Sequence, residues 1–186
     1  MPTCRDIITA AFRKGRVYAP GEEPSSDDMN DGLDELQNLY EQWGAGGMFG
    51  QLTDVATADD YEASPGERVV VTDTATITIP GTFAEDGTDY PAYTLSFVEV
   101  VDVPNGTVFR YLYENGVWTD IASLTLDDEA PLAGRGKMGL AACLTMQMDS
   151  WNAEILPSTM RQAASFKTSL SLKLGSDAQR TAPDYF

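Results

Sequence analysis

The fold is decided first by the stretch Met29-Asn-Asp-Gly-Leu-Asp-Glu-Leu-Gln-Asn-Leu-Tyr-Glu-Gln-Trp43. Its large apolar side chains recur at steps of four and three residues, the spacing of one buried face of an α-helix. They are Met29, Leu33, Leu36, Tyr40 and Trp43. Ser25 and Ser26 are candidate N-cap residues, and the glycines that begin at Gly44 end the pattern. This stretch therefore predicts a long amphipathic helix.

A shorter helix is expected before it. Thr3 can serve as the N-cap residue, and Asp6 stands three residues later, as in a capping box. An apolar stripe at helical spacing follows, made of Ile7, Ile8, Ala11 and Phe12. Gly15 ends this helix, and the turn-rich residues 18–24 connect it to the next one.

Two more helices are expected in the last third of the chain. Acidic residues at 127–129 precede Pro131, which is a common arrangement at a helix start. One apolar stripe then runs through Ala141, Leu144, Met148, Trp151 and Ile155. Pro157 breaks that helix, and a last helix carries Met160, Ala163, Phe166, Leu170 and Leu174 before Gly175.

The region between the two helix pairs has the composition of β-structure. Short runs of β-branched and aromatic residues are separated by Gly, Pro, Asn and Asp, and they lie at 68–71, 74–79, 94–101, 107–113 and 117–121. Glu114-Asn-Gly116 is typical of a tight hairpin. We therefore expect about five short strands in a small antiparallel sheet or barrel.

Together these patterns predict an α+β chain: a four-helix bundle with a small antiparallel β-domain inserted between helices 2 and 3, and an extended C-terminal tail. The expected bounds are 1–50 for the first two helices, 51–129 for the β insertion, 130–175 for the last two helices and 176–186 for the tail. The shared core of the bundle is expected to include Met29, Leu36, Trp43, Leu144, Trp151 and Leu170.

Charge is distributed unevenly along these 186 residues, which carry a net charge of -17 and no histidine. Residues 51–129 contain 16 acidic residues against 2 basic ones, whereas the rest of the chain contains 13 and 10. Binding to DNA through its phosphates requires an excess of Lys and Arg, so this chain is a poor candidate for gripping DNA. Two regions of different charge suggest two different partners.

Few patterns point to catalysis or to a bound group. Without histidine, a Ser-His-Asp or Cys-His relay is excluded. The glycine-rich stretches 44–50 and 134–136 lack the Lys-Ser/Thr ending of a phosphate-binding loop, and the acidic loops lack the pattern of a calcium loop. Cys4 and Cys143 cannot form a disulfide framework. We expect no catalytic residue, no metal and no cofactor, and no membrane partner because no long apolar stretch is present.

The few basic residues gather near two helix starts and ends. Arg5, Arg13, Lys14 and Arg16 lie on or just after the first helix, and Arg135 and Lys137 open the third. They form either a solvated helical face or an interface to an acidic neighbouring subunit, because arginine forks onto carboxylates. At the C-terminus, Arg180, Tyr185 and Phe186 are of the residue types that anchor interfaces.

The helical parts resemble the head-to-tail adaptors of tailed phages, the family of head-completion, packaged-DNA stabilisation and tail-accessory proteins. The resemblance lies in Arg5-Asp-Ile-Ile-Thr-Ala-Ala-Phe-Arg-Lys-Gly15, in Asp28–Trp43, and in Leu126-Asp-Asp-Glu-Ala-Pro-Leu132 with the helices after it. It rests on the order, spacing and length of these segments, which cover both ends of the chain.

This resemblance implies a ring, usually a dodecamer, at the virion neck between the portal protein and a tail or nozzle protein. Such a ring helps to retain packaged DNA and lets it pass on ejection without sequence-specific binding. The C-terminal extension would contact the portal through Arg180, Pro183, Tyr185 and Phe186, and the β insertion would face the tail. The chain would be made in the host cytoplasm.

The expected function is therefore that of a structural virion protein and not of an enzyme. Two alternatives remain open at this point. One is a virion-associated, carboxylate-based peptidoglycan hydrolase, which requires an acid buried beside an aromatic residue in the β insertion. The other is a tail-terminator or capsid decoration protein, which would form a ring of six or bind the capsid rather than the portal.

Overall fold

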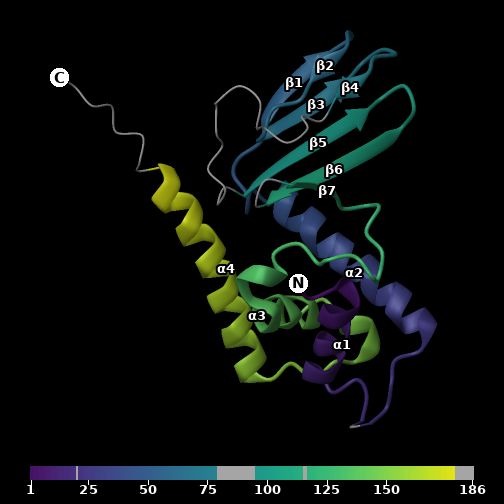
Figure 1. Ribbon diagram of the computed structural model, residues 1–186, viewed down its shortest axis with the longest axis vertical. Coiled ribbons are helices and arrows are strands. Elements are labelled where there is room, and N and C mark those ends of the chain that lie inside the picture. Colours follow the sequence, from purple (N-terminus) through teal and green to yellow (C-terminus); the bar gives the residue numbers. More distant parts are fainter. Residues whose placement is uncertain (20, 79–94, 115–116, 179–186) are drawn as a thin grey trace, which may run out of the picture. The chain divides into compact units, whose positions relative to one another are not determined.

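The computed structural model describes residues 1–19, 21–78, 95–114 and 117–178 (Figure 1). The chain divides into two compact units. Unit 1 comprises Met1–Tyr40 and Ser123–Leu170, and unit 2 is built on Glu41–Ala122. The helical part and the sheet part therefore each have a core of their own, and they are described in turn.

Unit 1 is made of helices. In chain order these are α1 (Cys4–Lys14), α2 (Ser26–Ala45), α3 (Ala133–Thr145), the short 3-10 helix η1 (Asp149–Trp151) and α4 (Pro157–Ala178). The last residues of α2 and of α4 belong to unit 2, because the boundaries fall after Tyr40 and after Leu170. The four expected helices are thus present, although their bounds and packing differ from those expected.

The capping box expected at the start of α1 is confirmed. The hydroxyl of Thr3 accepts a hydrogen bond from the backbone N–H of Asp6, and the Asp6 carboxylate accepts one from the N–H of Thr3. The stripe that follows is fully buried, and it consists of Ile7, Ile8, Ala11 and Phe12. Ser25 and Asp28 make the same reciprocal pair of hydrogen bonds at the start of α2.

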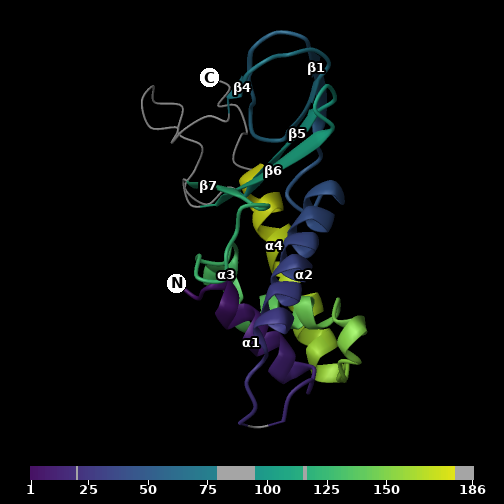
Figure 2. The same cartoon turned by 90° about the vertical axis from the view of Figure 1, so that its right-hand side faces the viewer.

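The helices do not form the expected four-helix bundle. Within the described residues, α1 and α3 are the two helices that pack along each other, and they lie side by side in both views (Figure 2). Thr145 at the end of α3 joins the pair by donating its hydroxyl to the Ala11 carbonyl at 3.1 Å. The other two helices contact this pair at single points. Gly32 of α2 lies against Ile8 of α1, and Phe166 of α4 lies against Gly139 of α3.

Helix α3 is shorter than its apolar stripe suggested. It ends at Thr145, and the chain then turns through η1, so Met148 and Trp151 lie outside the helix. The turn places the Trp151 ring edge-on to Phe12, with ring centroids 5.4 Å apart, and its indole N–H donates to Asp28 at 3.2 Å. Periodicity alone could not distinguish this turn from a continued helix.

Unit 2 contains two sheets. Its strands are β1 (Thr53–Thr57), β2 (Tyr61–Glu62), β3 (Glu67–Val71), β4 (Ile77–Thr78), β5 (Ser96–Asp102), β6 (Thr107–Glu114) and β7 (Val117–Asp120). The larger sheet has the order β1-β3-β5-β6-β7, and β2 pairs with β4 in a two-stranded sheet (Figure 1).

The expected antiparallel β-domain is also wrong, because the larger sheet is mixed. Strands β1, β3 and β5 run parallel to one another, and only β5-β6 and β6-β7 are antiparallel. Parallel neighbours need a crossover connection, which a two-residue hairpin cannot supply. Here the crossovers contain β2 and β4, which pair with each other outside the main sheet. In addition, strands β1 and β2 were not predicted from the sequence.

The two faces of the larger sheet have different environments. On one face Val69, Val71, Val98 and Val100 form an apolar cluster with Ala63, and Tyr61 and Ile77 from the small sheet pack against it. On the other face Phe97 stacks on Phe49 at 5.9 Å, and Phe49 in turn contacts Trp43. Trp43 therefore belongs to the core of unit 2 and not to the shared helical core expected for it.

Candidate interaction surfaces

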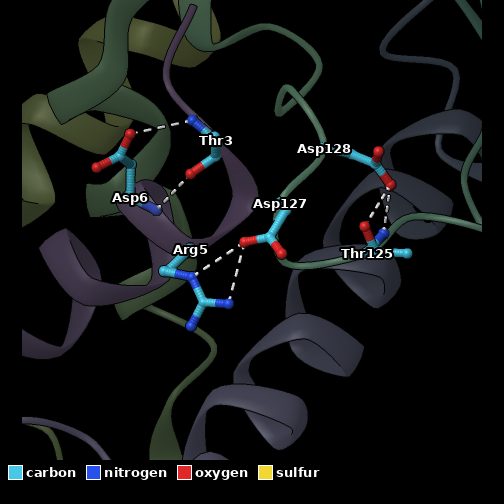
Figure 3. A network of polar contacts seen from close by, with 6 residues as sticks. All are labelled: Thr3, Arg5, Asp6, Thr125, Asp127 and Asp128. Carbon is cyan, nitrogen blue, oxygen red and sulfur yellow. Dashed lines mark hydrogen bonds and ion pairs between the residues drawn. The ribbon is translucent and has the colours of Figure 1, made fainter.

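The start of α1 is held by residues 125–128, which are distant in sequence but belong to the same unit (Figure 3). The N–H groups of Cys4 and Arg5 donate to the carbonyls of Asp128 and Leu126, each at 2.9 Å. The Arg5 guanidinium also donates to Asp127, at 3.1 Å from Nη2. The acidic segment that sequence reasoning assigned to a helix start therefore acts as a brace for the first helix.

This brace has a fixed shape of its own. Asp128 accepts hydrogen bonds from both the backbone N–H and the hydroxyl of Thr125, each at 2.7 Å. These two bonds, the hydroxyl's first, lower the pKa of the Asp128 carboxyl below its ordinary value. Hydrogen bonds to the ionised form have that effect, so the turn is most stable when Asp128 carries its charge.

A hollow of about 540 Å³ lies over α1 and α3. Its lining brings together four of the six basic residues proposed from the sequence as a subunit interface, Arg5, Arg13, Lys14 and Lys137. Met138 also lines it and is 50% exposed. Asp6 is the one acidic residue of the lining, so bases outnumber acids by four to one around Met138, and this surface is named the basic hollow.

The basic side chains of the hollow already have partners, and these contacts are exposed. Lys137 lies 3.4 Å from the Asp6 carboxylate, and Arg13 lies 3.8 Å from Glu23. Lys14 donates to Gln162. An exposed ion pair contributes only about 0–1 kcal/mol, so a carboxylate of another molecule can replace such a partner at small cost.

Of the two remaining basic residues, Arg16 lies beside the hollow. Arg16 follows α1 with a left-handed backbone (φ 53°) and pairs with Glu154 at 2.8 Å. Together with Arg13 it lines a neighbouring hollow of about 670 Å³. Arg135 lies on α3 but is not part of either lining. The structure thus groups five of the six residues on adjoining surfaces, and their role as an interface stays a prediction.

In unit 2, sequence reasoning missed a row of alternating charges that crosses four strands. Strand register aligns Asp54 of β1, Arg68 of β3, Glu99 of β5 and Arg110 of β6. Glu99 is only 9% exposed, and its two oxygens accept from Arg68 Nε at 2.9 Å and from Arg110 Nε at 2.8 Å. Arg110 also reaches Glu41, at 2.9 Å.

This row accounts for both basic residues of the region 51–129. It borders a hollow of about 690 Å³ whose wall includes Gly44 and Leu52. The hydrolase alternative requires a buried acid that can give a proton to its substrate. Glu99 is the buried carboxylate of this unit within the described residues, and both of its oxygens are occupied by arginine.

Four carboxylates gather at one end of the larger sheet. Because β1, β3 and β5 are parallel, the residues that follow them meet at the same end. These are Asp59 and Asp60 after β1, Asp73 after β3, and Asp102 at the end of β5. The last three accept hydrogen bonds from backbone N–H groups, and none of the four forms an ion pair with the part of the chain that the structure describes.

Exposed apolar side chains occupy the same end of the sheet. Val103, Val108 and Phe109 belong to the turn between β5 and β6 and to its flanking residues, and they are 57%, 41% and 40% exposed. A hollow of about 190 Å³ lies beside Phe109 and is bordered by Asp102 and Ile77. The four carboxylates and these three apolar residues are together named the acidic end.

The proposed portal contacts, Arg180, Pro183, Tyr185 and Phe186, lie outside the described residues. In the described ranges, no three His, Cys, Asp or Glu side chains come together as a group that could hold a metal ion. No helix in those ranges is long and apolar enough to cross a membrane.

Comparison with models of known protein families finds none that matches this chain, and comparison with curated proteins finds no match either.

Proposed function

We propose that this protein is a structural adaptor subunit of a phage virion, which assembles as a ring at the neck between the portal protein and the tail or nozzle protein. The proposal combines the resemblance of the helical segments with the arrangement of charge. The observation that supports it is local: four basic side chains line one hollow on unit 1, whereas both arginines of the larger sheet in unit 2 are bound to Glu99 and leave its exposed charge mostly acidic.

The charge arrangement suits a subunit with unlike neighbours. Both arginines of the larger sheet are bound to the buried Glu99, so the exposed charge of the sheet is mostly acidic. An acidic surface repels DNA phosphates, which suits a ring through which DNA must slide during packaging and ejection. The basic hollow on unit 1 suits an acidic protein surface instead.

The test uses the whole chain and the cognate portal protein. We expect the isolated chain to be a monomer or a weak oligomer and to form a ring, a dodecamer by the resemblance, when portal is added. Electron microscopy of the mixture shows whether rings form, and sedimentation measures binding. The tail was expected to begin at residue 176, but α4 continues to Ala178, so deleting residues 176–186 also removes the last three residues of that helix. The deletion should abolish portal binding and leave the rest of the fold intact, as judged by the circular-dichroism spectrum and the unfolding midpoint.

Three outcomes would contradict the proposal in whole or in part. The deleted chain could bind portal as well as the whole chain does, in which case the tail does not dock there. The whole chain could show no affinity for portal, or could release fragments from purified peptidoglycan. In that case the adaptor role itself is wrong.

A further inference from the structure

We propose that two copies of this chain associate head to tail, with the acidic end of one copy seated in the basic hollow of the next. The inference rests on the proposed ring and names the two surfaces that would build it. Unlike surfaces that meet in this way are heterologous, and repetition of such a contact closes into a ring if the rotation allows it.

The acidic end has the features of a docking surface. Phe109 of β6 exposes apolar area next to a small hollow, which Asp102 also lines. Val108 precedes it on the same strand and faces the other side of the sheet, and Val103 adds exposed apolar area in the turn. Around them stand carboxylates without ion-pair partners in the described part of the chain. An apolar centre with a charged rim is the usual anatomy of a protein interface.

The matching surface must therefore be an apolar side chain surrounded by bases. The basic hollow is such a surface, because Met138 stands among Arg5, Arg13, Lys14 and Lys137. Methionine is unbranched and flexible, so it can fit an irregular hollow such as the one beside Phe109. The acidic end thus offers four carboxylates that form no ion pair within the described residues, and the lining of the basic hollow carries four cations against one carboxylate, Asp6. This excess of opposite charge around apolar centres makes a second copy the proposed occupant.

The contact can be tested by cross-linking single-cysteine variants, since a disulfide traps a weak contact. One chain carries Met138→Cys and the other carries Phe109→Cys. The native Cys4 and Cys143 are buried and give little background. We expect a 1:1 mixture under mild oxidation to yield a disulfide-linked dimer, read as a doubled mass on a non-reducing gel.

The matched control moves the second cysteine to the opposite end of the sheet. Val117→Cys is the suitable variant, because Val117 is 59% exposed and pairs with Glu114, away from the turn at Gly106. Its mixture with the Met138→Cys chain should give roughly tenfold less dimer. Equal yields from the two mixtures would show that the cysteines meet by random collision, and would overturn the proposal.

Charge reversal adds a second readout. Introducing Lys137→Glu into the Met138→Cys chain brings two like charges together, and should lower the dimer yield by roughly tenfold. Introducing Asp102→Lys into the Phe109→Cys chain should then restore much of that yield. A yield that stays constant through both changes would contradict the pairing of these surfaces.

A chain with both Phe109→Cys and Met138→Cys separates this inference from contact inside one molecule. The proposal expects a ladder of linked chains, whereas a cross-link that forms only within single chains would overturn it. If the cross-links do not form but rings still form on portal, the proposed contact is wrong and the adaptor role stands. If the cross-links form as expected but the chain does not bind portal, the adaptor role is wrong and the contact between copies stands.

Discussion

Arg110 donates from Nε to Glu99 at 2.8 Å across the antiparallel pair β5-β6, and thereby ties a buried carboxylate to a half-buried guanidinium. Arg68 holds the second oxygen of Glu99 from the parallel neighbour β3. One carboxylate therefore links the antiparallel half of the sheet to its parallel half. Such a group is costly to bury unless both oxygens are satisfied.

Replacing Glu99 with glutamine should destabilise unit 2. The substitution keeps the volume but removes the charge that compensates Arg68 and Arg110. Breaking a buried ion pair by removing one partner costs about 3–5 kcal/mol, and we expect roughly 3 kcal/mol here because the arginines are partly exposed. Urea unfolding followed by tryptophan fluorescence measures the loss, since Trp43 and Trp118 both lie in this unit.

Glu62→Gln is the matched control for that variant, because Glu62 lies in the same unit with an exposed side chain. It should unfold within about 0.5 kcal/mol of the natural chain. Similar midpoints for the two variants would mean that the charge row contributes no more than an exposed carboxylate does.

Gly44 should not tolerate a side chain. A Cβ at this position would lie 2.3 Å from Cζ of Phe97, whose ring is buried and stacked on Phe49. Alanine favours helix, yet here it forces the ring to move, and overpacking of this kind costs about 1–3 kcal/mol. We expect Gly44→Ala to lower the unfolding midpoint in urea, and adding Phe97→Leu to recover part of the loss.

Gly134→Ala provides the comparison on a helix of unit 1. There the new Cβ would meet only the Met1 sulfur, at 3.3 Å, and that flexible side chain can move aside. This variant should be as stable as the natural chain or slightly more so. If Gly44→Ala behaved in the same way, the close packing of the glycine on Phe97 would be ruled out.

The helices could be predicted because their signals are local. The capping box of Thr3 and Asp6 lies within four consecutive residues, and the stripe from Ile7 to Phe12 spans less than two helical turns. Neither signal depends on what the rest of the chain does. Helix packing does depend on it, and the apolar stripes alone did not show that α1 and α3 pair while Trp43 joins unit 2.

The sheet and the charge row could not be predicted for the same reason. Strand partners are chosen over long separations: β3 pairs with β5 across a connection that starts at Thr72 and contains β4. The prediction from the sequence joined successive strands by hairpins, which makes every strand pair antiparallel. Only the parallel register places Arg68 beside Glu99 and gathers Asp73 and Asp102 at one end.

Asp28 should make the stability of unit 1 depend on acid. Hydrogen bonds from Ser25, Tyr18 and Trp151 lower the pKa of its carboxyl from 3.8 to about 2. The folded chain thus favours the ionised form, and the unfolded chain binds a proton first as the pH falls. The stabilisation is complete above pH 3.8 and is lost as the pH falls to about 2.

We therefore expect Asp28→Asn to lose stability less steeply than the natural chain over that pH range. Some dependence remains, because the pKa values of Asp6 and Asp128 are also lowered by hydrogen bonds. Thermal unfolding followed by circular dichroism at several pH values measures the slope. Asp27→Asn, at the exposed neighbouring position, should keep the natural slope, and equal slopes for both variants would contradict the role given to Asp28.

Cys4 and Cys143 should be inert towards thiol reagents while the chain is folded. Burial is the main cause that raises the pKa of Cys4 to about 12 and that of Cys143 to about 11, and the charge of Asp128 contributes at Cys4. Since the thiolate is the reactive form, little of it exists at pH 8. A chromogenic disulfide reagent should react with neither thiol at pH 8 and with both in denaturant, whereas an added cysteine at Met138 should react at once. Fast labelling of Cys143 without denaturant would show that α3 and α4 separate readily, because this thiol lies 3.6 Å from the Ala163 carbonyl of α4.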